Sequence, residues 1–414
     1  MAAPKLRFKE FDGDWTGLKI KDLVKSLDAG VSVNSEDVEP QEYEYSVLKT
    51  SCISSGYFDE NERKRVLQDG EIQRLKEPVL DDSILMSRMN TPLLVGMNAY
   101  VFKAPKNTFL PDRLWQLKID NNKTVTRWLA FYLGSDQGLN QIRDLASGTS
   151  NSMKNITKPD VLNIDLFAPQ KEEQTKIASF LSNVDEKISQ LTQKHQLLSQ
   201  YKQGMMQKLF SQQIRFKADD GSEFGAWKHC KLKDVLISYR LGGNYSNAEM
   251  VTSYPLIKMG NLGRGSINLD KIEYIPEDQI IDPEDLIKKN DLFFNTRNTL
   301  DLVGKVALWR GELPIAYYNS NLLRLDFENN IFMNYLFNEQ KTLEKLKAIA
   351  SGTTSVAAIY TKDLLKINLE IPCLEEQNKI ASFLSSIDQK IEVVAQQIEQ
   401  AKTWKKGLLQ QMFV

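Results

Sequence analysis

The sequence predicts an α+β fold in which two mixed α/β domains are joined by two long antiparallel coiled-coil helices, with a pseudo-two-fold internal repeat. Three observations predict this fold. Residues 172–182 (EEQTKIASFLS) recur as residues 375–385 (EEQNKIASFLS). A heptad pattern runs through each copy and beyond it. The regions between the copies contain short apolar runs bounded by Gly, Asn, Asp and Pro, which are typical of strands.

The repeat extends over both halves of the chain, so each half is expected to hold one domain and one helix. Further matches occur in the same order: ASGT at 146–149 and 350–353, Trp15 and Trp227, and Arg-Phe at 7–8 and 215–216. Because the N-terminus matches the segment that follows the first helix, the halves resemble a cyclic arrangement that has been cut open.

The repeat divides the chain into four predicted segments. Pro169 and Pro372 fall just before the helices, where a proline stop is expected. The segments are a first globular domain (1–168), a first helix (169–212), a second globular domain with its N-terminal linker (213–371) and a second helix (372–414). Helical patches are also expected at 125–133 and 332–346, inside the two globular domains.

The two helices carry matching apolar seams with alternating steps of three and four residues. The simplest partner for each helix is the other. A pseudo-two-fold arrangement makes the helices antiparallel, with one domain at each end. Asp185 and Asp388 lie off the seams, where charged residues are normally solvated. The seam residues expected to pair the helices are Ile177, Leu181, Val184, Ile188, Leu191 and Leu198 in the first helix, and Ile380, Leu384, Ile387, Ile391, Val394 and Ile398 in the second.

The composition is that of a folded cytoplasmic protein. Of the 414 residues, 42% are apolar and 26% charged, and the net charge of −1 excludes a uniformly basic surface. The three cysteines lie far apart, which argues against a disulfide framework and fits a reducing compartment. Apolar runs are too short for a membrane span, and the early charges are unlike a secretory signal.

The sequence lacks the signatures of the common catalytic chemistries. With two histidines and no CxxC motif, a His/Cys zinc site is not expected, and no metal ligands are predicted. There is no GxxxxGK[ST] phosphate loop and no Asn/Asp-Pro-Pro-aromatic element for amino-group methylation. We therefore predict no catalytic residues in this chain.

Two related domains on a helical rod are suited to bind two sites on B-DNA, whose major groove repeats about every 34 Å. Arg, Asn and Thr are residue types that recognise bases, while Lys and small polar residues hold phosphates. The candidate contacts are Lys49, Ser51, Arg88, Asn90, Thr91, Ser147, Gly148 and Thr149 in the first half, and Lys258, Asn261, Arg264, Arg297, Asn298, Thr299, Tyr318, Ser351, Gly352 and Thr353 in the second.

Each candidate also has a structural interpretation. The Arg-Asn-Thr segments suit turns, the Ser-Gly-Thr segments suit caps, and Tyr318 suits a half-buried strand position. When Asn90 is matched to Asn298, Arg88 and Arg297 are one residue out of register.

The chain resembles the specificity subunit of type I restriction–modification systems. The resemblance rests on the duplicated Pro-x-x-Glu-Glu-Gln-x-Lys-Ile-Ala-x-Phe-Leu from Pro169 and Pro372, on the upstream Ala-Ser-Gly-Thr, and on Leu6-Arg7-Phe8 with Asp14-Trp15. It covers essentially the whole length. In that family each globular domain is a target-recognition domain for one half of a split, asymmetric DNA site. The helices set the gap and dock modification subunits.

The resemblance implies a non-catalytic subunit that binds double-stranded DNA and two modification subunits, which methylate adenine. S-adenosylmethionine, ATP and Mg²⁺ are implied for partner subunits, including the motor–nuclease subunits of the full complex, and no cofactor for this chain. Two other classes remain open from the residues alone: a methyltransferase or nuclease with an unrecognised site, and a coiled-coil assembly protein that binds only proteins.

Overall fold

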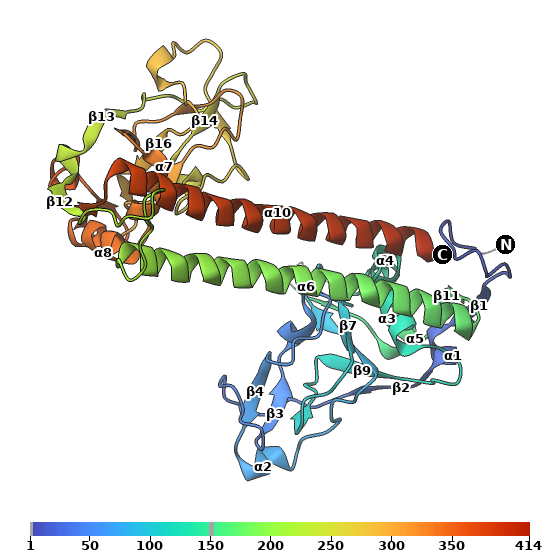
Figure 1. The fold of residues 1–414 in the computed structure, drawn as a ribbon. Coiled ribbons are helices and arrows are strands. Elements are labelled where there is room, and N and C mark those ends of the chain that lie inside the picture. The colour runs from blue at the N-terminus through green and yellow to red at the C-terminus, as the bar shows by residue number, and fades with distance from the viewer. Residues whose placement is uncertain (1–2, 149–152) are drawn as a thin grey trace. The chain divides into compact units, whose positions relative to one another are not determined.

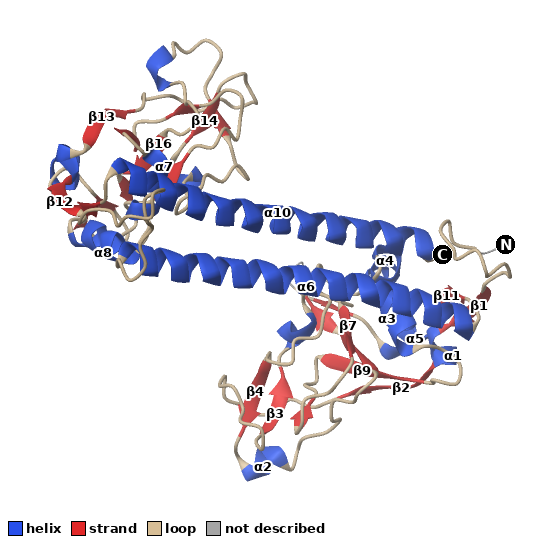
Figure 2. Cartoon of the chain, in the orientation of Figure 1, coloured by secondary structure: helices blue, strands red, loops and turns tan. Residues whose placement is uncertain are grey.

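The computed structural model describes residues 3–148 and 153–414. The chain divides into two compact units: unit 1 is Met1–Thr192 with Gln396–Val414, and unit 2 is Gln193–Ala395. Each unit holds one mixed α/β region, called here a head, and one part of each long helix. The first head covers residues 16–168 and the second covers residues 228–371. Figure 2 shows that the strands belong to the heads.

The two long helices are α6 (Lys171–Phe210) and α10 (Leu374–Met412), of 40 and 39 residues. At a rise of 1.5 Å per residue, each is about 60 Å long. Both are labelled in Figure 1. Within the described ranges, no helix combines the length and apolar character that a membrane crossing requires.

The first head is built around a four-stranded antiparallel sheet in the order β2-β9-β5-β7, and a three-stranded sheet in the order β4-β3-β8. Its strands are β1 (Thr16–Lys19), β2 (Val24–Ala29), β3 (Tyr45–Leu48), β4 (Arg63–Val66), β5 (Ser83–Ser87), β6 (Met89–Asn90), β7 (Asn98–Val101), β8 (Thr108–Phe109), β9 (Leu114–Ile119), β10 (Lys154–Asn155) and β11 (Asp165–Ala168). Its helices are α1 (Ile20–Leu23), α2 (Asp69–Ile72), α3 (Thr126–Gly134), α4 (Asp136–Asp144) and α5 (Lys158–Leu162), with a 3₁₀ turn at Thr50–Ile53.

The second head repeats this topology, with sheets in the orders β13-β20-β16-β18 and β15-β14-β19. Its strands are β12 (Lys228–Lys231), β13 (Leu236–Leu241), β14 (Pro255–Ile257), β15 (Glu273–Tyr274), β16 (Leu292–Asn295), β17 (Arg297–Asn298), β18 (Val306–Leu308), β19 (Tyr317–Tyr318), β20 (Leu322–Phe327), β21 (Ser351–Gly352), β22 (Ala357–Ala358) and β23 (Asn368–Ile371). Its helices are α7 (Asn330–Phe337), α8 (Gln340–Ala348) and α9 (Thr361–Leu364), with 3₁₀ turns at Leu232–Asp234, Met259–Asn261 and Pro283–Asp285.

The helical patch expected at 332–346 consists of two helices, α7 and α8. The first ends and the second begins in the middle of this segment. Asn338 closes α7, and the Glu339 carboxylate then accepts hydrogen bonds from the backbone N–H groups of Lys341 and Thr342 at 3.0 and 2.7 Å. A side chain that satisfies free N–H groups in this way is a helix N-cap.

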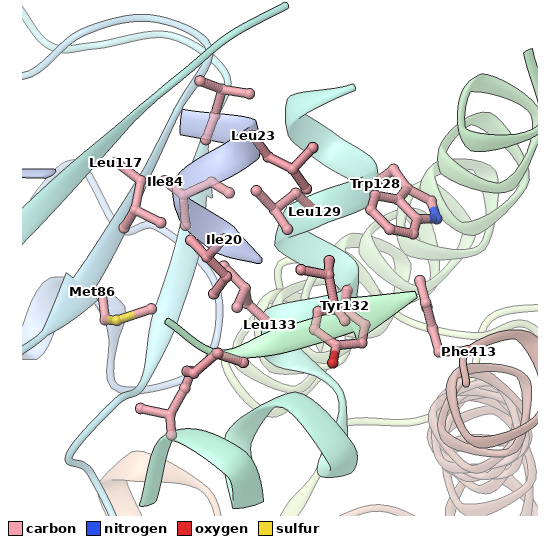
Figure 3. Close-up of a cluster of buried hydrophobic side chains, with 14 of the residues drawn as sticks. Ile20, Leu23, Ile84, Met86, Leu117, Trp128, Leu129, Tyr132, Leu133 and Phe413 are labelled. Atoms are coloured by element: carbon pink, nitrogen blue, oxygen red, sulfur yellow. The ribbon is translucent and has the colours of Figure 1, made fainter. Parts of the chain in front are cut away.

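Each head packs against the long helices through one apolar core. In unit 1, α3 places Trp128 and Tyr132 between the four-stranded sheet and Phe413, which follows α10. Figure 3 shows these three rings beside Leu133 and Ile20. In unit 2, Phe332 of α7 contacts Phe210 at the end of α6 in the same way, with ring centroids 5.8 Å apart.

The repeated Glu-Glu-Gln motif anchors the start of each long helix. Glu173 forms a buried ion pair with Arg7 (Nη2–Oε2 2.7 Å), and Glu376 forms the equivalent pair with Arg215 (2.7 Å). The amides of the following glutamines donate to the carbonyls of Pro169 and Pro372. The motif thus ties the head, the helix and an arginine of the preceding linker together.

The N-terminal segment lies against the end of α10 in the same way that the linker after α6 lies against the end of α6. The backbone N–H of Leu6 donates to the carbonyl of Gln411 at 2.9 Å, and that of Ile214 donates to Lys208 at 3.3 Å. These contacts are what a cyclic arrangement opened at one point requires.

The long helices pair in opposite directions. In unit 1 the first part of α6 packs on the last part of α10, and in unit 2 the last part of α6 packs on the first part of α10. Among the predicted seam residues, Leu198 and Ile391 are half-buried and the others are buried. The interpretation of Asp185 and Asp388 as solvated is wrong: their side chains are 14% and 11% exposed, because each faces a lysine of the other helix.

Candidate nucleic-acid interface

A small accessory sheet in each head brings the two groups of candidate residues together. In the first head, β6 pairs antiparallel with β10, and Ser147 bridges to Asn155 of β10 by two backbone hydrogen bonds of 2.9 and 3.0 Å. In the second head, β17 pairs with β22, which also pairs with β21. The Arg-Asn-Thr segment and the Ser-Gly-Thr segment therefore lie in one sheet in each head.

The asparagines of this sheet shape the turn that follows them. The Asn90 side-chain oxygen accepts from the backbone N–H of Thr91 at 2.9 Å, and the Asn298 oxygen accepts from Thr299 at 2.8 Å. Gly96 and Gly304 end the same loops with φ near +75° and +72°, where glycine is favoured. A Cβ on Gly96 would lie 2.3 Å from the Ile142 side chain. The loop frame is thus shared between the heads.

The arginines are not equivalent. The Ser87 N–H donates to the Met97 carbonyl as the Asn295 N–H donates to Lys305, so Arg88 corresponds to Thr296 and Met89 to Arg297. The side chain of Arg297 is exposed, while that of Arg88 is half-buried. The two heads therefore present different chemistry on the same frame.

The two candidate lysines are already paired with acids. Lys49 Nζ lies 2.6 Å from Asp37, and Lys258 Nζ lies 2.5 Å from Glu273. The hydrogen bond with Asp37 raises the pKa of Lys49, and the one with Lys258 lowers the pKa of Glu273. A phosphate contact at either lysine would have to replace a carboxylate. The Ser51 hydroxyl likewise donates to Glu62.

The Ser-Gly-Thr segments are exposed strand ends and loops. Ser147, Gly148, Ser351, Gly352 and Thr353 are all exposed, and Thr149 lies outside the described residues. Gly352 has φ near +130°, and a Cβ there would lie 2.3 Å from the Val356 carbonyl oxygen. The second segment is therefore a tight backbone turn that presents hydroxyl groups.

Two candidates are withdrawn as DNA contacts because the structure buries them. Tyr318 is fully buried against Phe293, and burial raises the pKa of its hydroxyl to about 12. Asn261 is 6% exposed and donates to the carbonyls of Asn268 and Lys271, so its side chain holds a turn. Arg264 stays at the surface, where it donates to the Asp301 carbonyl at 3.1 Å.

Sequence reasoning missed the side chains that surround Asp185 and Asp388. Lys202 and Lys405 stand at equivalent seam positions and pair with Asp388 and Asp185, and the lysine in each apolar seam is the signal from which a buried acidic partner could have been predicted. Within the part of the chain that the structure describes, no cluster of His, Cys, Asp and Glu is suited to hold a metal ion.

The comparisons with known proteins agree with this architecture. The family model "Type I restriction modification DNA specificity domain" matches twice, at residues 12–200 and 225–403. The type I restriction enzyme MjaVIII specificity subunit of Methanocaldococcus jannaschii is 26% identical over 422 aligned positions, covering 97% of this chain and 94% of that protein. The putative MjaX specificity subunit of the same organism is 28% identical over 195 positions, 45% of each chain.

Solved structures share the fold along the whole chain. The S subunit of a type I restriction–modification system from M. genitalium matches with a TM-score of 0.58 at 18% identity, covering 100% of this chain and 99% of that one. A second structure, titled for the complex assembly and conformational transition of the type I R-M system, matches with a TM-score of 0.53 at 16% identity. The match covers 97% of both chains.

Two copies of a specificity domain on paired helices define a DNA-recognition component rather than an enzyme. This chain belongs to the type I restriction modification DNA specificity domain family, and both of its halves carry the domain.

Proposed function

We propose that this chain is the sequence-recognition subunit of a type I restriction–modification complex in which each head recognises one half of a bipartite, asymmetric DNA site. The helices set the gap between the half-sites. Two modification subunits dock on the helices and methylate adenine, with S-adenosylmethionine bound by those partners. Motor–nuclease subunits that use ATP and Mg²⁺ complete the restriction enzyme.

The observation that carries this proposal is the accessory sheet, which occurs in both heads with the same frame and different side chains. Arg297 lies on β17, whereas Arg88 directly precedes β6. The two arginines therefore stand one position apart in the shared frame. A shared frame with different base-contacting residues is what recognition of two different half-sequences needs.

Docking of two identical partners is supported by duplicated aromatic pairs at the starts of the helices. Phe8 contacts Phe180 in unit 1 at a centroid distance of 5.7 Å, and Phe216 contacts Phe383 in unit 2 at 5.6 Å, both edge-to-face. Exposed aromatic groups stand at equivalent positions of the other helix: Trp404, 55% exposed, and Tyr201, 51% exposed. Aromatic side chains are enriched at protein interfaces.

The proposal is tested by co-expressing this chain with its modification subunits and mapping methylated adenines in the host genome by single-molecule sequencing. We expect methylation in every copy of one split site, with an unspecified gap, and none when this chain is omitted. Methylation at an undivided site, or no added methylation, would contradict the proposal.

A further inference from the structure

Asp388 is the centre of a cluster, the Asp388 cluster, in which both long helices and the second head meet. Its carboxylate lies 2.5 Å from Lys202 Nζ of α6. It also accepts a hydrogen bond of 2.7 Å from the Tyr335 hydroxyl on α7 and one of 2.9 Å from Arg310, which follows β18. The Lys202 ammonium stands 5.3 Å from the centre of the Tyr335 ring.

Asp185 is the centre of the corresponding Asp185 cluster in unit 1. Its carboxylate lies 2.6 Å from Lys405 Nζ of α10 and accepts a hydrogen bond of 3.1 Å from the Tyr57 hydroxyl of the first head. Lys405 also donates to the Tyr57 oxygen at 3.0 Å, and its ammonium lies 5.4 Å from the centre of the Phe131 ring.

The two clusters are copies of one arrangement with the helices exchanged. Asp185 and Asp388 are equivalent in the repeat, as are Lys202 and Lys405. Phe131 is the counterpart of Tyr335, because each lies under the equivalent lysine. Phe131 has no hydroxyl, and Tyr57 supplies one from a different part of the first head. The hydroxyl–carboxylate contact is therefore present in both units, although different elements provide it.

The Asp388 carboxylate is held in the ionised form. Burial raises the pKa of Asp388, but Lys202, Tyr335 and Arg310 outweigh burial, and the pKa lies below its ordinary value. A buried charge with fixed partners tolerates few alternative arrangements, because sliding the helices or tilting the head would leave it unpaired. Buried ionic groups are known to fix register in paired helices.

The unit 1 cluster has one contact fewer. Phe102 corresponds to Arg310 in the strand register; it is 74% exposed and has no polar group that could bind the carboxylate. A cavity of about 250 Å³ lies beside Asp185, lined by Tyr57, Tyr100, Phe102 and Arg127 among others. The first head is thus joined to Asp185 by one hydrogen bond, where the second head is joined to Asp388 by two.

We propose that Asp185 and Asp388 are positioning residues that fix each head, and the register of the helix segments beneath it, so that the complex prefers one gap between half-sites over its neighbours. This inference rests on the proposed function, since a gap has meaning only for a bipartite site. The aspartates touch no base in this account and act through the placement of the heads.

The test uses the full complex with its modification subunits and a DNA library that keeps both half-sequences and varies the gap in single-base-pair steps. The variants are Asp185→Asn, Asp388→Asn and their combination. Glu392→Gln is the matched control, because Glu392 is exposed on α10. For the double variant we expect methylation at gaps one base pair longer or shorter than the preferred gap to rise about tenfold relative to methylation at the preferred gap. A change of this size is typical when contacts between coupled residues are lost. The preference for each half-sequence should stay unchanged.

A gain-of-contact variant keeps the test decisive if the asparagine variants fold poorly. Phe102→Arg with Arg127→Ile gives unit 1 the residues that unit 2 carries at Arg310 and Ile331. We expect a higher Tm and a narrower gap profile than in the wild-type complex. An unchanged Tm and gap profile would count against the inference.

The outcomes separate the two proposals. If the wild-type complex has a preferred gap and all folded variants keep its profile, the positioning role is wrong while the proposed function stands. If the wild-type complex methylates without any preferred gap, the proposed function fails and the positioning role fails with it.

Discussion

Under the proposed function, Arg297 is a candidate for contact with a base. Its side chain is exposed on β17. In the shared frame Arg88 corresponds to Thr296, the residue directly before Arg297. An arginine that makes bidentate hydrogen bonds to guanine contributes about 1–3 kcal/mol of discrimination against the wrong base.

We predict that Arg297→Ala relaxes the base preference at one position of one half-site and lowers methylation of the original site by about tenfold or more. Lys390→Ala, at an exposed position of α10, is the control. The measurement is methylation of a library with each position of both half-sites randomised. A uniform loss over all sequences would mean that Arg297 contacts phosphate instead.

The Asp388 carboxylate gives a prediction on pH. A carboxylate whose pKa is lowered by folding stabilises the protein above its ordinary pKa of 3.8, and the stabilisation is lost as the pH falls through the lowered value. We expect Asp388→Asn to destabilise the protein at pH 7 by about 2 kcal/mol, and we expect this difference to shrink as the pH falls below 3.8. Urea unfolding of both proteins over this range measures the difference. A difference that does not shrink at any pH below 3.8 would contradict the ionised assignment.

Single residues were where sequence reasoning was weakest. Tyr318 and Asn261 carry chemistry suited to DNA, but a strand residue or a turn residue does not reveal from sequence which way it faces. Asp185 and Asp388 were assigned to solvent from heptad positions alone, because the heptad pattern describes two helices and contains no information about a head packed beside them.

At the scale of elements, the long helices were predicted well and the accessory sheets were not foreseen. Forty residues of three-and-four spacing give a strong periodic signal, and the prolines mark where it starts. Strands of two residues such as β6 and β17 give no measurable alternation, and their partners lie far away in sequence. Their existence depends on tertiary packing.

The helices provide the element-scale prediction. Seven residues inserted after Thr192 in α6 and seven after Ala395 in α10, at the boundaries of the units, preserve the seams. Each helix lengthens by about 10 Å, so the preferred gap is expected to grow by roughly three base pairs with both half-sequences unchanged.

The control for this experiment is the same insertion in α6 alone, which leaves the paired helices unequal and is expected to lower complex formation. Methylation of the gap library by the double insertion is the measurement. An unchanged gap would show that the helices do not set the spacing.

At the scale of the whole molecule, the internal repeat determines the architecture. The duplicated motif predicted two domains, two helices and their antiparallel pairing, and the equal sheet orders of the two heads agree with it. The halves also differ in sequence over much of both heads, including the side chains of the accessory sheets. Under the proposed function, which bases those side chains contact depends on a DNA geometry that neither repeat contains.

The central claim is that each head recognises one half-site by itself. The most direct measurement replaces residues 11–168, which contain the first head, with a copy of residues 223–371, which contain the second. Methylation is then mapped by single-molecule sequencing in a host with the modification subunits. Because the helices pair antiparallel, we predict that the half-sequence of the second head is kept and that the other half becomes its inverted copy. Retention of the original asymmetric site would contradict the claim.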